Sequence, residues 1–91
     1  LTPISFEISK IYPNPFNPSF TLEISVGKIG KYEFNIYDIN GRIVKNSIYS
    51  INNIGLNLIN FDLSGMSSGA YFISCKYELK TSQIIPIILL K

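Results

Sequence analysis

Apolar and polar residues alternate along most of the chain, which is the pattern of strands with one buried and one solvated face. Phe20 to Val26 and Tyr32 to Ile36 show it most clearly, and no window has the period of a helix. The pattern predicts strands in about seven segments. These are Ile4 to Ile8, Phe20 to Val26, Tyr32 to Ile36, Arg42 to Tyr49, Leu56 to Leu63, Ala70 to Glu78 and Ser82 to Leu90.

Turn-forming residues separate these segments. Asn40-Gly41 is typical of a hairpin because both residues tolerate positive φ. The other turns are expected at Gly27 to Gly30, Asn52 to Gly55, Ser64 to Gly69 and Lys80-Thr81. Short strands at this spacing predict an all-β fold, a seven-stranded antiparallel immunoglobulin-like β-sandwich, with a small barrel as the alternative.

The last predicted strand departs from the alternation. Ile84 to Leu90 is apolar at both parities, as in a strand that is covered on both sides or paired with a partner. Pro86 cannot donate a ladder hydrogen bond, so it predicts an edge position or a bulge. A bare hydrophobic edge promotes aggregation, and we therefore expect the domain itself or another protein to cover it.

The stretch YPNPFNP, Tyr12 to Pro18, interrupts the strands near the start of the chain. Each proline fixes its own φ, restricts the preceding residue and removes a backbone donor. These properties predict a stiff, polyproline-like spacer that leads the first strand into the second without pairing. The alternative is a binding epitope, since Pro15 and Pro18 have PxxP spacing.

Composition is that of one globular domain spanning residues 1–91. The chain has 46% hydrophobic and 15% charged residues, and its net charge of +2 comes from dispersed basic side chains, which argues against nucleic-acid binding. The apolar run at the end is far shorter than the roughly 20 residues of a membrane span. Because the sequence begins at Leu1, we expect a domain cut from a longer precursor.

Candidate chemistry is sparse. The chain has no histidine, a single cysteine and no phosphate-binding motif, so we expect no enzymatic activity, metal site or cofactor. Cys75 shares its parity with Tyr71, Ile73 and Tyr77, which predicts a buried core thiol. The carboxylates fit solvated positions, with Asp62 at the rim or capping the turn after it.

Calcium binding has little support, because Asn and Asp oxygens are calcium ligands but no Asp-rich run is present. Sugar binding is the stronger rival, and Tyr37 and Tyr49 are the rings hardest to place inside. The alternative function is therefore a structural or carbohydrate-binding immunoglobulin-like accessory domain of a secreted enzyme.

Four blocks in order resemble a known family. IYPNPFNPSFTLEI, YEFNIYDINGRIVK, LSGMSSGAYFISCKY and a terminal apolar strand ending in LLK look like the type A C-terminal sorting domain of the type IX (Por) secretion system. The resemblance covers Ile11 to Lys91. Sandwiches with YPNPFNP also resemble an immunoglobulin-like domain of flagellar hook-capping proteins, which would make the module architectural.

The resemblance to the sorting domains implies a non-catalytic secretion signal. The cargo, fused N-terminally, would cross the periplasm and the outer membrane to the cell surface. The outer-membrane secretion machinery would recognise the folded domain, and a sortase-like protease would remove it. The matching positions are Pro13, Asn14 and Pro15; Asp38, Gly41 and Arg42; Gly69 and Tyr71; and Ile87, Ile88, Leu89, Leu90 and Lys91. The chain departs from the family pattern in having Ile85 and Pro86 where a lysine usually precedes the apolar run.

Overall fold

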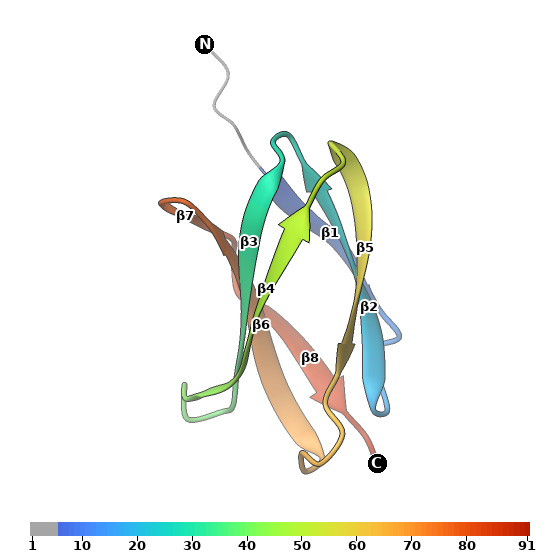
Figure 1. Ribbon diagram of the computed structural model, residues 1–91. Helices are drawn as coiled ribbons and strands as arrows, with labels where there is room; N and C mark the ends of the chain where they lie inside the picture. Colours follow the sequence, from blue (N-terminus) through green and yellow to red (C-terminus); the bar gives the residue numbers. More distant parts are fainter. Residues whose placement is uncertain (1–5) are drawn as a thin grey trace.

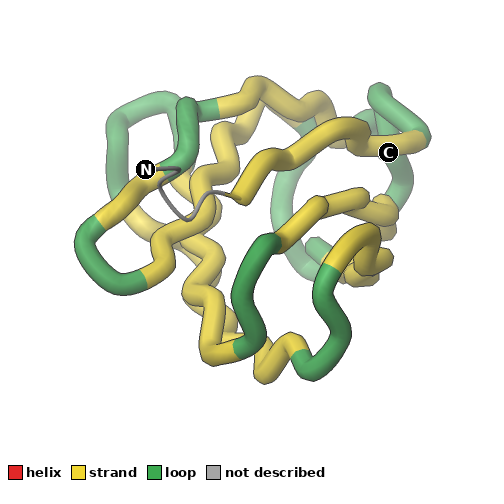
Figure 2. The backbone as a smooth tube through the Cα atoms, turned by 90° about the horizontal axis from the view of Figure 1, so that it is seen from above, coloured by secondary structure: helices red, strands yellow, loops and turns green. Residues whose placement is uncertain are grey.

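The computed structural model describes residues 6–91, which form two antiparallel sheets packed face to face (Figure 1). Ile4 and Ser5, where the first strand was expected to start, lie outside the described residues. Figure 2 shows only strands and loops along the described chain. The strands are β1 (Phe6–Tyr12), β2 (Ser19–Val26), β3 (Gly30–Tyr37), β4 (Ile43–Ile51), β5 (Gly55–Asp62), β6 (Gly69–Tyr77), β7 (Lys80–Thr81) and β8 (Ile85–Leu89).

The strand order confirms the predicted fold class. One sheet has the order β1-β2-β5, and the other has the order β4-β3-β6, with β7 and β8 both paired to β6. The two sheets pack against each other through their apolar faces, which is the arrangement of an immunoglobulin-like sandwich.

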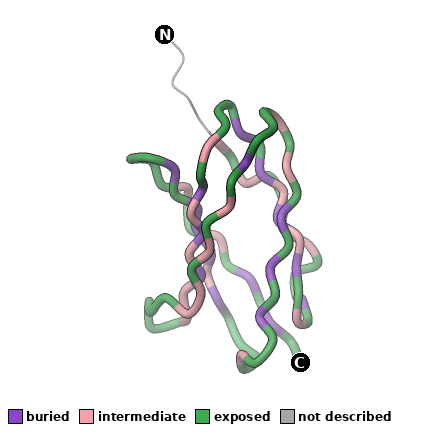
Figure 3. The backbone as a smooth tube through the Cα atoms, viewed as in Figure 1, coloured by how far each residue is buried: buried purple, intermediate pink, exposed green. Residues whose placement is uncertain are grey.

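The core lies between the sheets, and buried and exposed positions alternate along the strands that enclose it (Figure 3). Every second residue of β2 and β3 points inward, and Leu22, Ile24, Tyr32, Phe34 and Ile36 are buried. Aromatic rings fill much of the interior, where edge-to-face and stacked contacts add to area burial. The inward side chains form the core of the sandwich, and the polar residues between them are solvated.

The last expected strand begins later than predicted, at Ile85, and the turn expected before it forms a short strand of its own, so the described residues contain eight strands instead of seven. Lys80–Thr81 was expected to be a turn but pairs with Lys76 and Tyr77 as β7. Ser82, which follows β7, still contacts β6: its N–H donates to the Cys75 carbonyl at 2.7 Å, and its hydroxyl oxygen accepts a hydrogen bond from Cys75 N–H at 2.9 Å. β8 resumes at Ile85 beside the other end of β6.

The first strand also differs from the prediction, which ended it at Ile8. β1 runs on to Tyr12, and its register with β2 shifts between Ile8 and Lys10. A bulge inserts one residue and reverses the parity of the residues after it. Ile8 and Ile11 therefore both pack against the core although they are three residues apart, and simple alternation does not predict an inward Ile11.

Candidate functional site

The YPNPFNP segment lies along the free edge of β8. The Asn14 side chain donates from Nδ2 to the Pro86 carbonyl (3.3 Å) and accepts at Oδ1 from Ile88 N–H (3.0 Å). Phe16 N–H donates to the Ile88 carbonyl (2.9 Å), and Leu90 N–H donates to the Phe16 carbonyl (3.0 Å). The contact is parallel and covers the outward backbone groups of Pro86, Ile88 and Leu90.

These contacts correct the expectation of a spacer that cannot pair. The amide of Asn14 uses one N–H and its oxygen here, as a backbone peptide would, and so extends the hydrogen bonding that the main chain of Phe16 makes with the same edge. Prolines on either side of Asn14 bring no N–H of their own to the edge. The segment is also not a regular polyproline helix, because bends interrupt it.

β8 is an edge strand with one buried face. Ile87 and Leu89 are fully buried, whereas Ile88 and Leu90 are exposed on the opposite side. The strand is therefore not covered on both faces, so the prediction of a strand covered on both sides, made from its apolar run, is wrong. Pro86 sits where the edge prediction placed it, since its nitrogen points away from β6 and no ladder bond is lost.

The segment Gly69 to Tyr71 lies directly beside β8. Gly69 pairs with Leu89 and Tyr71 pairs with Ile87. The Tyr71 hydroxyl donates to the Ser67 carbonyl four residues earlier at 2.6 Å, which is the tyrosine corner of immunoglobulin-like sandwiches. Lys91 N–H donates to the Ser68 hydroxyl at 2.9 Å, so the same turn also holds the end of the chain.

The hairpin turn Asp38 to Arg42 is closed around one carboxylate. Asp38 Oδ1 accepts from the backbone N–H of Asn40 (2.9 Å) and of Arg42 (3.0 Å), and Oδ2 accepts from the Arg42 guanidinium at 3.2 Å. The hydrogen bond from Arg42 N–H, followed by that of Asn40, holds the pKa of Asp38 below its ordinary value. Gly41 completes the turn with φ of 81°, and its N–H donates to the Asp38 carbonyl.

The sequence motifs form one contiguous band, which we name the terminal band. Asp38 and Ile39 share a cleft of about 210 Å³ with the turn Ser67 to Tyr71, β8 lies next to that segment, and Asn14 lies on β8. These contacts join Asn14, Phe16, Asp38, Ile39, the turn Ser67 to Tyr71 and the residues Ile87 to Lys91, which define the band. Of the other predicted positions, Pro13 and Pro15 are exposed and flank Asn14, and Gly41 and Arg42 belong to the hairpin turn of Asp38.

Two members of the band were missed from the sequence. Phe16 is buried and packs edge-to-face on Phe20, with ring centroids 4.8 Å apart. Ser68 binds Lys91 through its hydroxyl. The lone aromatic ring between two prolines was the available signal for Phe16, whereas nothing distinguished Ser68 from its neighbours.

The remaining candidates have structural positions. Cys75 is fully buried, as expected, and burial raises its pKa to about 12. Asp62 caps its turn by accepting from the N–H and the hydroxyl of Ser64. Tyr49 packs edge-to-face on Phe34 and Phe61, and Tyr37 is half-buried beside Ser74.

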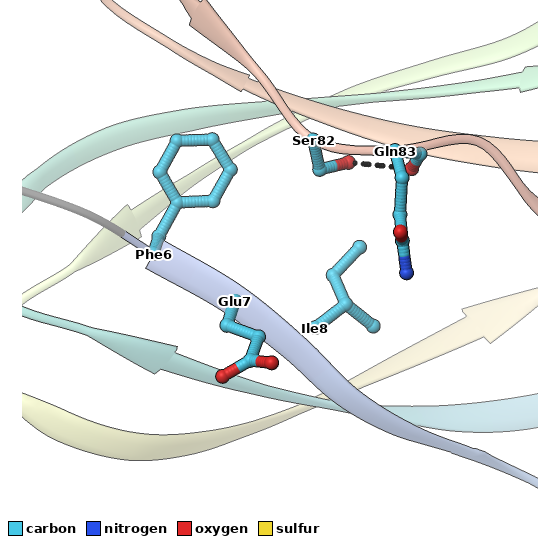
Figure 4. Close-up of a pocket in the computed structure, with 5 residues that line it drawn as sticks. All are labelled: Phe6, Glu7, Ile8, Ser82 and Gln83. Atoms are coloured by element: carbon cyan, nitrogen blue, oxygen red, sulfur yellow. Dashed lines mark hydrogen bonds between the residues drawn. The ribbon is translucent and has the colours of Figure 1, made fainter.

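A pocket opens between β1 and the segment after β7 (Figure 4). It has a volume of about 200 Å³ and is lined by Phe6, Glu7, Ile8, Ser82 and Gln83. In the described part of the chain, no three potential metal ligands gather, and no helix could cross a membrane.

Comparisons with known proteins identify a family and a similar fold. The profile of the secretion system C-terminal sorting domain matches residues 10–88. Dimeric latent PorU from Porphyromonas gingivalis contains a similar fold, with a TM-score of 0.82 and 21% sequence identity over 99% of this chain. The chain spans 10% of that protein's length. No curated protein matches the sequence significantly.

Proposed function

The chain belongs to the family of secretion system C-terminal sorting domains, and from this premise we propose that the terminal band is the surface that the secretion machinery recognises. The domain is a C-terminal signal of the type IX secretion system and directs the protein that carries it to the cell surface or the extracellular space. Domains of this family are in general non-catalytic. As a secretion signal, the domain has the secretion machinery as its partner.

The observation that carries the proposal is the contact of Asn14 and Phe16 with β8. It joins the first sequence motif to the last, which are 74 positions apart at Asn14 and Ile88. The edge of β8 is already hydrogen-bonded, so a receptor strand could not add to it without displacing Asn14. Recognition therefore uses the outward side chains of Ile88, Leu90 and Lys91.

Two further steps belong to the proposal. The cargo precedes this domain in the precursor, and a sortase-like protease of the machinery removes the domain after export. The resemblance of the four motifs to the family supports both. Of the two tyrosines weighed for sugar binding, Tyr49 does not support that alternative, because its ring packs against core aromatics.

The test is a fusion of a signal peptide, a reporter and residues 1–91 in a host with this secretion system. We expect surface delivery, and we expect Ile88→Ser with Leu90→Ser to reduce it strongly because a receptor would contact both exposed side chains. Deleting Ile87 to Lys91 should abolish delivery, but this deletion also removes buried residues, so the double substitution is the decisive variant.

Leu56→Ser with Leu58→Ser is the matched control, because these leucines are similarly exposed on β5 in the opposite sheet. Circular dichroism of each purified domain checks that it is folded. Delivery that is unchanged by the Ile88 and Leu90 substitutions would contradict the proposed role of the terminal band.

A further inference from the structure

The outer edge of β8 presents a short row of backbone groups. Among the described strands, β8 pairs with β6 alone, so its other edge faces away from the sheet. That edge carries the carbonyl of Pro86, the N–H and carbonyl of Ile88 and the N–H of Leu90. Asn14 binds the Pro86 carbonyl and the Ile88 N–H. Phe16 binds the Ile88 carbonyl and the Leu90 N–H, so the YPNPFNP segment engages the whole row.

This row is self-complementary about Ile88. If two copies of β8 met edge to edge in antiparallel orientation, each Ile88 would exchange both of its hydrogen bonds with the Ile88 of the second copy, as hydrogen-bonded pairs in antiparallel sheets do. The Leu90 N–H of each copy would then meet the Pro86 carbonyl of the other. A bare edge of this kind is a template for pairing with an identical chain.

The side chains of β8 give little protection against such pairing. β8 contains no charged residue, and Ile88 is 43% exposed. Two other outer strands differ, because β1 carries Glu7 and Lys10, β4 carries Lys45, and the pairing of each strand has a shift of register. Charged residues, bulges, prolines and covering loops are the devices that keep sheet edges from pairing. β8 has Pro86, and beyond that it depends on a covering segment.

We propose that the YPNPFNP segment protects the edge of β8 from pairing with a second copy of the chain and so keeps the domain monomeric. Asn14 and Phe16 act by occupying the hydrogen-bonding groups that the second copy would use. This inference is independent of the proposed function, because it concerns the domain alone and is tested without the secretion machinery.

The composition of the segment suits this task. A strand laid along β8 would cover one edge and create a new one, which could pair in its turn. The three prolines of the segment bring no N–H, and Asn14 reaches β8 through its side chain, so the covering segment is a poor template for a further strand. The buried ring of Phe16, which packs on Phe20, fixes the segment to the core.

The test measures the association of purified domains by sedimentation equilibrium over a range of concentrations. The uncovered variant combines Asn14→Ala, which frees the Ile88 N–H, with Pro86→Val, which adds an N–H to the edge at an exposed position. The control combines Asn17→Ala with Pro86→Val, because Asn17 is exposed in the same segment. We expect the unmodified domain and the control to be monomeric. The uncovered variant should dimerise with a dissociation constant at least about tenfold below that of any association of the control.

A further substitution locates the interface. Ile88→Lys in the uncovered variant should restore the monomer, because two lysines would face each other across the paired edges and like charges directly opposite are destabilising. Leu56→Lys, at a position 59% exposed on β5, should not restore it. Hydrogen exchange at the Ile88 amide should be fast in the dilute uncovered variant and slow in its dimer.

Circular dichroism of each variant checks that it is folded. A folded uncovered variant that stays as monomeric as the control overturns the inference. Association that Leu56→Lys abolishes as fully as Ile88→Lys also overturns it, because β8 would then not be the interface. If Pro86→Val prevents folding, Asn14→Ala alone against Asn17→Ala gives the same comparison, and equal association of these two variants overturns the inference as well.

Discussion

Asn14 connects the two ends of the sequence through a single amide. Its side chain makes both hydrogen bonds to β8 in a solvated position, where each bond contributes modestly to stability. We expect Asn14→Ala to lower the free energy of unfolding by about 1 kcal/mol. Urea unfolding measures this change, and hydrogen exchange should show faster exchange of the Ile88 amide. Asn17→Ala, in the same segment, should change stability by less than about 0.5 kcal/mol. Equal effects of the two substitutions would contradict the role of Asn14.

The carboxylate of Asp38 makes the stability of the folded domain depend on pH. Its pKa is lowered in the folded domain, chiefly by the hydrogen bond from Arg42 N–H, so the ionised form stabilises the fold. This contribution is fully present above the ordinary pKa of 3.8 and is lost as the pH falls through the lowered pKa. We expect Asp38→Asn to be less stable than the unmodified domain at neutral pH and the difference to shrink in acid. Thermal unfolding at a series of pH values measures this.

The Asp62 carboxylate has its pKa lowered as well, by Ser64, so Asp62→Asn serves as an independent site for comparison. The double variant should lose both contributions additively because the two turns share no partner. A stability difference for Asp38→Asn that is constant from neutral pH to strong acid would contradict the assignment.

At the scale of elements, β3 and β6 approach closely at Gly30. A Cβ placed there would lie 2.8 Å from Tyr77 Cε1 and 3.0 Å from its hydroxyl, and the Tyr77 ring is held by stacking on Tyr32. We expect Gly30→Ala to destabilise the domain by about 2 kcal/mol through overpacking. Gly55 also has positive φ, but no atom lies within 4 Å of the position that its Cβ would take. Gly55→Ala should therefore lower the free energy of unfolding only by the backbone strain, about 1 kcal/mol.

A double-mutant cycle isolates the steric part of the Gly30 effect. In a Tyr77→Leu background the side chain no longer reaches Gly30, so Gly30→Ala should cost less there than in the unmodified domain. An identical cost in both backgrounds would show that the ring is not the obstacle.

The elements also show how far the sequence predicts this fold. The strands with regular alternation, β2 and β3, were located to within two residues because burial of one face dictates the pattern. β1 was cut short because a bulge near Ser9 breaks the period. The last strand was expected to begin at Ser82, but Ser82 bonds to Cys75 partly through its hydroxyl and β8 begins at Ile85; a side-chain hydrogen bond of this kind has no periodic signal.

The candidate site was predictable only in part. Motif resemblance identified its residues, but their convergence depends on the register between Gly69 and Leu89 and on the contact of Asn14 with Ile88. Both are long-range contacts that local sequence does not encode. Phe16 was missed because three prolines nearby argue against pairing, whereas in the structure they bracket the two residues that pair.

At the scale of the whole molecule, Cys75 reports on the integrity of the sandwich. Its thiol is fully buried and burial raises its pKa to about 12, so neither access nor ionisation favours reaction in the folded domain. We expect iodoacetamide at about pH 8 to leave the native thiol unmodified and to label it completely in denaturant. Mass spectrometry measures this, with an exposed Ser50→Cys as the reactive control. Rapid labelling of the native domain would contradict the buried position.

The hydrogen bonds of Asn14 and Phe16 to β8 have a consequence for the order of folding. The loop that this contact closes contains almost all of the domain. Contacts between residues so far apart in the sequence form late, because the chain must first lose the entropy of closing the loop between them. The docking of the YPNPFNP segment is thus a completion step that waits for the last strand of the sequence to be made and paired. A chain interrupted before β8 would lack the terminal band, so recognition of this band, as proposed, would select chains in which β8 has been made and docked.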